Sequence, residues 1–221
     1  MANRPYNQYC AIAHTLDIVG DRWCLLLIRN MMTGPKRFTD LLHGLPGISS
    51  NTMAERLKVL GERGVVTRRE IPPPVATYLY ALTDLGYDLM GTLSALAEWG
   101  GKSLGAPQEG QRFLAESAEF MILDALKAGQ PDPPELHLVI HVQDALDERH
   151  FDVQLGPHLH DNHILVEEAE VEDAALRITT ALEPLMQWST GQLSLSTARE
   201  SGQIVIEGDP AGVETLLKWV D

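Results

Sequence analysis

The sequence predicts two modules: a mainly α-helical module with a two-stranded β ribbon, then an α+β module with a mostly antiparallel sheet. Three observations lead to this prediction. Apolar residues recur at helical intervals up to residue 60, two alternating runs then flank three prolines, and strand-like alternation dominates after a Gly-rich stretch at 100–107. The 221 residues, 44% hydrophobic and 22% charged, suffice for two ordinary domain cores. We expect one module at 1–104, a linker and connecting helix at 105–134, and the other module at 135–221.

The first module should begin with helices, because apolar residues spaced by three and four positions share one helix face. Ser49 is a typical N-cap for the last of the first four helices, predicted at 12–19, 21–33, 38–43 and 49–63. Strands are predicted at 65–71 and 75–81, around the prolines. A fifth helix from Thr83 to Trp99 carries more apolar residues than a single core requires.

The second module should begin with an amphipathic helix at 113–125 that ends before a Pro-rich stretch. Alternating apolar and polar residues then predict strands at 136–142, 150–155, 163–166, 175–179 and 203–207. Helices are expected at 182–191 and close to the C-terminus, where Val213, Leu216, Leu217 and Val220 recur at helical spacing.

The element order of the first module, ending in a polar helix and a basic ribbon, is that of a winged helix-turn-helix. The major groove of DNA accepts a helix with short hydrogen-bonding side chains and a cation, and a ribbon can hold arginines near phosphates. The predicted DNA-binding residues are Lys36, Arg37, Ser49, Ser50, Asn51, Thr52, Arg56, Arg68, Arg69 and Thr77. The alternative interpretation is an ordinary solvated surface helix beside a plain hairpin.

The net charge of the whole chain, -14, would argue against a polyanionic partner such as nucleic acid. The charge is unevenly distributed, however. Residues 1–105 hold 11 basic and 9 acidic side chains, a net charge of +2, whereas residues 106–221 hold 6 and 22, a net charge of -16. The first module can therefore approach DNA, and the second should point away from it.

Several motifs run through the first module: Leu16 to Trp23, Gly34 to Phe38, Leu45 to Ser49, Glu55 to Leu57 and Tyr80 to Gly86. In combination, residues 10 to about 101 resemble an HxlR-type member of the MarR-like winged-helix transcription regulators of bacteria. The resemblance implies double-stranded DNA as a partner, a homodimer formed through the N-terminal helix and the helix after the wing, and a two-fold DNA site.

The two cysteines, Cys10 and Cys24, are too few for a disulfide framework. The N-terminus shows no signal peptide, so we expect a cytoplasmic protein with reduced thiols and no membrane partner. In some members of the family that the chain resembles, the cysteine at the position of Cys10 senses oxidants or electrophiles. The departure here is Ala11 where the family usually has proline, and packing near the dimer interface is the alternative role. Cys24 is expected in the core.

The second module, from roughly Leu136 to Val220 and most specifically from Leu176 to the last helix, resembles sterol-carrier-protein-like domains, which enclose an apolar tunnel. The resemblance implies a small apolar molecule or lipid as the effector. The candidate wall residues are Phe151, Leu165, Leu185, Met186, Trp188, Leu195 and Leu216, all of which are alternatively ordinary core.

The histidines between His158 and His163 are weighed as a metal site, but Gly156-Pro157 favours a loop, and no metal or other cofactor is predicted. The sequence has no nucleophile elbow, zinc-protease motif or phosphate-binding loop, so we predict no enzyme. The preferred function is an effector-responsive transcription regulator. The alternatives are a lipid carrier, or an unrecognised enzyme in the second module, with the winged helix used only for dimerisation.

Overall fold

The computed structural model describes residues 5–71, 77–105, 108, 111, 113–126, 132–143, 148–156, 164–168 and 174–221. The chain divides into two compact units, Met1–Leu96 and Ala97–Asp221, and each is described by itself. In the described residues, no helix is both long enough and apolar enough to cross a membrane.

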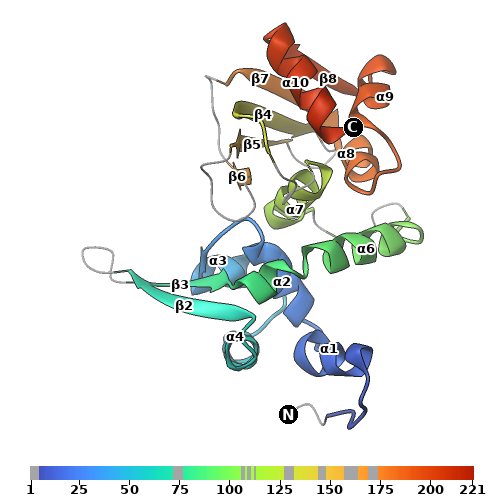
Figure 1. The fold of residues 1–221 in the computed structure, drawn as a ribbon. Coiled ribbons are helices and arrows are strands. Elements are labelled where there is room, and N and C mark those ends of the chain that lie inside the picture. The colour runs from blue at the N-terminus through green and yellow to red at the C-terminus, as the bar shows by residue number, and fades with distance from the viewer. Residues whose placement is uncertain are drawn as a thin grey trace. The chain divides into compact units, whose positions relative to one another are not determined.

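Helices build the core of the first unit, and a small sheet flanks them (Figure 1). The helices are α1 (Ala11–Val19), α2 (Cys24–Met31), α3 (Phe38–His43), α4 (Ser50–Glu62), α5 (Asp84–Tyr87) and α6 (Met90–Gly101), the last of which continues past Leu96. The strands β1 (Lys36–Arg37), β2 (Val66–Ile71) and β3 (Thr77–Leu82) form an antiparallel sheet in the order β1-β3-β2. Leu27, Ile28 and Met31 of α2 and Met53 and Leu60 of α4 are fully buried.

The structure corrects the predicted fifth helix, which is interrupted after Tyr87. Thr83 caps α5 as expected, since its Oγ1 accepts a hydrogen bond from the N–H of Gly86 at 3.2 Å. The N–H of Leu89 then donates to the carbonyl of Gly86 at 3.2 Å, three residues back, so the α-helical pattern is broken there. Gly86 is itself under tight packing, because a Cβ at this position would come within 2.4 Å of the Val65 carbonyl oxygen.

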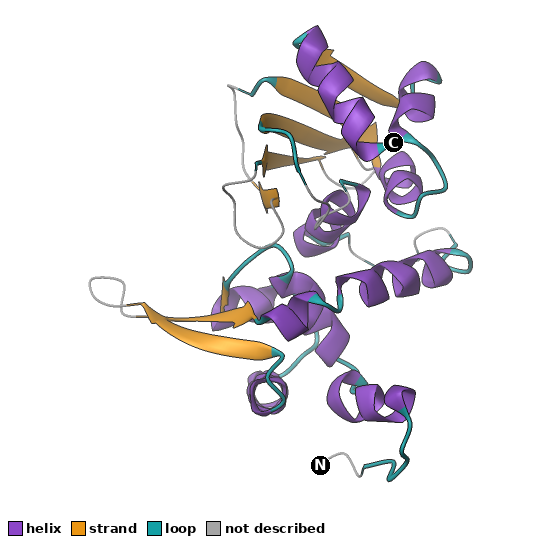
Figure 2. Ribbon diagram, viewed as in Figure 1, coloured by secondary structure: helices purple, strands orange, loops and turns teal. Residues whose placement is uncertain are grey.

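The second unit is an α+β layer, with its helices packed on a five-stranded sheet (Figure 2). The sheet order is β6-β5-β4-β7-β8, and only the β4–β7 pair is parallel, which confirms the predicted mostly antiparallel sheet. The strands are β4 (Leu136–Gln143), β5 (Glu148–Leu155), β6 (Ile164–Glu168), β7 (Leu176–Ala181) and β8 (Ile204–Gly208). The helices are α7 (Ala115–Ala125), α8 (Leu182–Ser189), α9 (Leu195–Glu200) and α10 (Pro210–Val220).

The two faces of this sheet differ in character because side chains alternate along each strand. Ile140, Phe151 and Ile178 share one face through the cross-strand register, and all three are fully buried. His137 and Asp152 lie on the other face, where His137 Nε2 and Asp152 Oδ1 are 2.5 Å apart. The apolar core of the second unit therefore lies on one face of the sheet, and a polar, histidine-bearing surface lies on the other.

Candidate nucleic-acid interface

The α3–turn–α4 segment forms a compact helix-turn-helix in which the turn itself is anchored in the core. Leu45 and Ile48 of the turn are buried, and the N–H of Ile48 donates to the carbonyl of Leu45 at 3.1 Å. Gly47 has a φ of 93°, a left-handed conformation that side-chain-bearing residues rarely adopt. Glycine at this position therefore lets the chain reverse direction and fixes the point at which α4 begins.

Ser49 caps α4 as the sequence predicted. Its Oγ accepts a hydrogen bond from the N–H of Thr52 at 3.1 Å and lies 2.8 Å from Thr52 Oγ1. Ser49 is exposed and Thr52 is half-buried, so both hydroxyls serve the cap. Ser50 and Asn51 are exposed in the first turn, where unpaired backbone N–H groups and the helix dipole favour an anion.

The outward face of α4 is defined by the opposite, buried face of Met53, Leu57 and Leu60. Asn51 and Lys58 lie on the outward face, two turns apart and beside Glu55 and Glu62, and all four are exposed. Lys58 Nζ is 3.7 Å from Glu62 Oε1, and the side chain of Lys58 is 76% exposed, so this ion pair is loose. Lys58 was not among the predicted DNA-binding residues, although its spacing of seven residues from Asn51 could have identified it.

Arg56 is one of the predicted DNA-binding residues, but it does not lie on the outward face of α4. Arg56 follows Met53 by three positions and therefore borders the buried face, and its side chain is only 11% exposed. Its Nη2 lies 3.0 Å from Asp21 Oδ2, ahead of α2, and 3.9 Å from Glu55 Oε2. Arg56 Nε is buried without a hydrogen-bond partner among the described residues. Arg56 thus ties α4 to the start of α2.

The wing consists of β2 and β3, with β1 paired to the outer side of β3. Arg68 and Arg69 are both exposed on β2, and the Arg68 guanidinium stacks on the Tyr78 ring at 3.6 Å. Thr77 begins β3 opposite Ile71. The prolines predicted at the wing tip lie outside the described residues.

Basic residues lie on both faces of the wing sheet, because neighbours along a strand point in opposite directions. Arg68 and Lys36 flank Tyr80 in the cross-strand register, whereas Arg69 and Arg37 flank Leu79 on the other face. Arg37 is exposed and Lys36 is half-buried. A single DNA surface therefore meets one of these cross-strand rows directly.

The two cysteines differ in environment. Cys10 is exposed and stands immediately before α1, without a side-chain hydrogen bond to the helix end. Cys24 is buried as expected, and burial, reinforced by the Asp21 carboxylate, raises the pKa of its thiol to about 11. Cys24 is therefore a protonated core residue at neutral pH.

The predicted wall residues of the second unit are corrected in one respect. Phe151, Leu185, Trp188, Leu195 and Leu216 are buried, and Met186 and Leu165 are half-buried. Leu165 pairs with Gln154 and so lies on the polar face of the sheet, opposite to Phe151. These seven side chains therefore do not line one tunnel. The histidines from His158 to His163 lie outside the described residues. Among the residues that the structure describes, no group of three metal-ligating side chains occurs.

Together, the capped α4, the anchored turn before it and the antiparallel wing define a winged helix-turn-helix protein, as predicted for the first module. The model of the HxlR-like helix-turn-helix family matches residues 18–108. The chain belongs to this family. The match ends before the second unit's sheet, so the resemblance of that unit to sterol carrier proteins stays a prediction.

The relatives are named as transcription regulators. The chain is 36% identical over 84 residues to an uncharacterized HTH-type transcriptional regulator, YvaP of Bacillus subtilis, covering 38% of this chain and 78% of YvaP. It is 35% identical over 83 residues to the HTH-type transcriptional regulator YodB of the same species, covering 38% of this chain and 74% of YodB. The uncharacterized HTH-type transcriptional regulator MT3179 of Mycobacterium tuberculosis is 34% identical over 98 residues, and the match spans 44% of this chain and 61% of MT3179.

Proposed function

We propose that this protein is a transcription regulator that binds a specific double-stranded DNA operator through α4 and the wing. The observation that carries the proposal is the exposed row on α4, in which Asn51 and Lys58 occupy one face while Ser49 caps the helix. An amide and a flexible cation on one helix face are side chains that hydrogen-bond to base edges and phosphates in the major groove. The names of the relatives support a regulator, and the proposal includes no catalytic activity.

The wing supplies contacts that position the protein without selecting a sequence. Arg69 and Arg37 form one cross-strand row, and Arg68 and Lys36 form the other. We assign to the row that meets the duplex a role at the phosphates next to the operator half-site. Arg56 has an indirect role in this proposal, because its ion pair with Asp21 orients α4.

The test begins with selection of binding sequences from a random duplex pool by the full-length protein. The affinity for the selected operator is then followed by fluorescence anisotropy across salt concentrations. A protein that contacts 6–10 phosphates should lose about 10³–10⁵ in affinity between ~50 and ~200 mM salt. Failure to enrich any sequence, with no binding at low salt, would refute the proposal.

We propose further that the protein acts as a homodimer. Tyr9, Ile12 and Leu16 recur at helical spacing on or just before α1, and Ile12 is 73% exposed. Leu96 and Trp99 of α6 are also exposed, three residues apart. Large apolar side chains clustered on helix surfaces are typical of protein interfaces, and a second copy of the chain is the partner that the family resemblance implies.

Sedimentation equilibrium tests this assembly. The parent protein should have twice the mass of one chain, and Ile12→Asp with Trp99→Asp should shift it to the monomer. His14→Asp is a control for the added charge, because His14 is exposed and lies on the side of α1 opposite to Ile12. A parent protein that stays monomeric at micromolar concentration would refute the homodimer.

The second unit is proposed to be the effector-binding part of the regulator. Its net charge makes it a poor ligand for DNA, which supports a separate role. A ligand bound there can control the operator only if it has different affinities for the DNA-competent and DNA-incompetent states of the dimer.

A further inference from the structure

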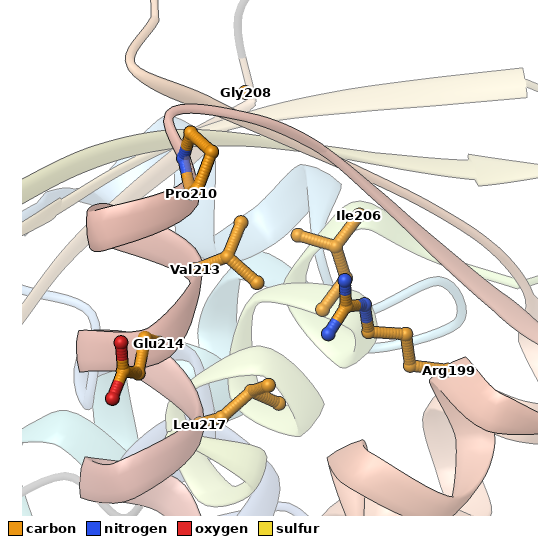
Figure 3. Close-up of a pocket in the computed structure, with 7 residues that line it drawn as sticks. All are labelled: Arg199, Ile206, Gly208, Pro210, Val213, Glu214 and Leu217. Atoms are coloured by element: carbon orange, nitrogen blue, oxygen red, sulfur yellow. The ribbon is translucent and has the colours of Figure 1, made fainter.

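A pocket opens on the second unit between α9, β8 and α10 (Figure 3). Its volume is about 260 Å³. The lining residues are Arg199 of α9, Ile206 and Gly208 of β8, and Pro210, Val213, Glu214 and Leu217 of α10. None of the residues predicted from the sequence to line a tunnel is among them.

The apolar part of the pocket comes from two elements. Val213 and Leu217 lie one turn apart on the same face of α10, and Ile206 extends toward them from β8 (Figure 3). Val213 is 7% exposed, whereas Ile206 and Leu217 are half-buried and so form a wall that reaches the surface. An apolar group bound here would be removed from water against three branched side chains.

The frame of the pocket is held by hydrogen bonds at both ends of α10. Asp209 caps its N-terminus by accepting a hydrogen bond from the N–H of Gly212 at 3.0 Å. At its C-terminus, the side chain of Asp221 accepts hydrogen bonds from the N–H groups of Leu195 and Ser196, at 2.9 and 3.0 Å. The second set joins the end of α10 to the start of α9. The spacing between the two helices is therefore fixed before a ligand arrives.

The charges in the lining are one cation and one anion, and they are not equivalent. Glu214 Oε1 lies 2.6 Å from Lys218 Nζ in an exposed ion pair, and this partner lowers the pKa of Glu214, so the Glu214 carboxylate already has a cationic partner outside the pocket lining. The Arg199 guanidinium makes no ion pair or hydrogen bond with any described residue, and its side chain extends from α9 toward Ile206 (Figure 3). The pocket thus presents an uncompensated cation beside an apolar wall.

We propose that this pocket binds a small monocarboxylate whose apolar body is about the size of one aromatic ring or a short branched chain. The carboxylate pairs with Arg199, whose planar guanidinium suits two parallel hydrogen bonds. The apolar body lies against Ile206, Val213 and Leu217. Cavities of about 150 Å³ accept benzene, so this larger pocket has room for a ring and a carboxylate but not for a long acyl chain.

This inference rests on the proposed function only for its regulatory consequence, since binding is measured on the full-length protein without DNA. The probe is phenylacetate, followed by the methyl resonances of Ile206, Val213 and Leu217. Phenylacetamide matches its shape without the charge, and acetate matches its charge without the ring. Phenylacetate should shift these resonances saturably, and the amide and acetate should each bind at least about tenfold more weakly.

Two pairs of variants locate the ligand. Arg199→Gln should weaken phenylacetate binding at least about tenfold, whereas Lys102→Gln, which removes the same charge outside the pocket, should leave it unchanged. Ile206→Phe fills the pocket and should abolish binding. Its match, Val205→Phe, lies on the same strand but on the opposite face of the sheet. Circular dichroism and the thermal midpoint verify that each variant is folded.

Three results would overturn the proposal: no saturable binding of phenylacetate, equal binding of the amide, or unchanged binding by Arg199→Gln. Tighter binding of palmitate than of phenylacetate, with the same methyl shifts, would also overturn it in favour of a lipid tunnel. The operator assay separates this failure from that of the proposed function. A carboxylate that binds without changing operator affinity leaves the pocket in place and removes its regulatory role, whereas absent operator binding removes the regulator.

Discussion

Loss of the Arg56–Asp21 ion pair should destabilise the first unit and thereby weaken DNA binding. At the observed 3.0 Å, the attraction between the two charges is about 5–6 kcal/mol for an effective dielectric constant near 20. Desolvation offsets most of this attraction, and Asp21 retains some contact with water. We therefore expect Arg56→Gln to lower the free energy of unfolding by about 1.5 kcal/mol, which is a shift of ~6–12 °C in the midpoint of a unit this size.

Chemical unfolding of Arg56→Gln, Asp21→Asn and the double variant measures the interaction directly. The cycle should give a coupling energy of about 1 kcal/mol, because each single change removes the same pair. Unfolding of the first unit is followed through the indole N–H resonance of Trp23 in the NMR spectrum, because Trp99, Trp188 and Trp219 of the second unit would contribute to the total fluorescence. Lys58→Gln is the matched control, since Lys58 makes an exposed pair with Glu62, and it should change stability by less than about 0.5 kcal/mol.

Measurements of operator binding distinguish whether Arg56 orients α4 or contacts DNA directly. Asp21→Asn should weaken DNA binding together with stability. If Asp21 acted on DNA only through its charge, the opposite would be expected, because its carboxylate would repel a phosphate. Lys58→Gln should weaken binding with no loss of stability, and it should reduce the salt dependence by about one ion. If Arg56→Gln abolished binding with unchanged stability, and Asp21→Asn were neutral, Arg56 would contact DNA directly and our placement would be wrong.

Four further predictions concern the wing, the two cysteines, the pH dependence of stability and the C-terminal helix. Because Arg68 and Arg69 point to opposite faces of the wing, one of the two single alanine variants should account for nearly all the loss of DNA affinity in the double variant; equal contributions would contradict this. In the folded protein at pH 8, iodoacetamide should alkylate the exposed Cys10 and spare Cys24, as mass spectrometry would show. The raised pKa of Cys24 adds stability below its ordinary value of 9.0 that should be lost as the pH rises toward about 11, measured by unfolding. Asp221→Ala leaves two N–H groups of α9 without their hydrogen-bond acceptor and should lower the stability of the second unit by about 1 kcal/mol in thermal unfolding. An unchanged midpoint would show that these hydrogen bonds do not stabilise the unit.

The sequence predicted those features of the first unit that depend on local pattern. The inward face of α4 followed from the spacing of Met53, Leu57 and Leu60, and the cap followed from Ser49. The orientation of Arg56 did not follow, because its partner, Asp21, is 35 positions away in the chain and no local rule connects the two. The helical spacing that buries Leu57 also brings its neighbour Arg56 to the border of the core. The same spacing places Lys58 on the outward face, so Lys58 was the better candidate for a direct contact with DNA.

The placement of Leu165 in the candidate wall of the second unit was wrong for a different reason, which is strand register. A strand places alternate side chains on opposite faces, so a shift of one residue exchanges the faces. The pairing of Leu165 with Gln154 is set by the connection between β5 and β6, whose length and turn geometry the sequence pattern does not specify. The pocket beside α10 was equally inaccessible, because it depends on α9, a helix of six residues with too few turns to show a period.

The uneven charge of the chain predicts opposite salt dependences for ligand binding to the second unit and for operator binding. The second unit carries a net charge of -16, so an anionic ligand must reach Arg199 against a repulsive long-range field. Salt screens charges separated by more than about 10 Å but acts less on a guanidinium and a carboxylate in contact. Phenylacetate binding should therefore hold steady or tighten as salt rises, while operator binding weakens steeply. A pocket whose affinity falls with salt as steeply as that of the operator would show that its ligand is drawn by the overall field rather than held by the contact at Arg199.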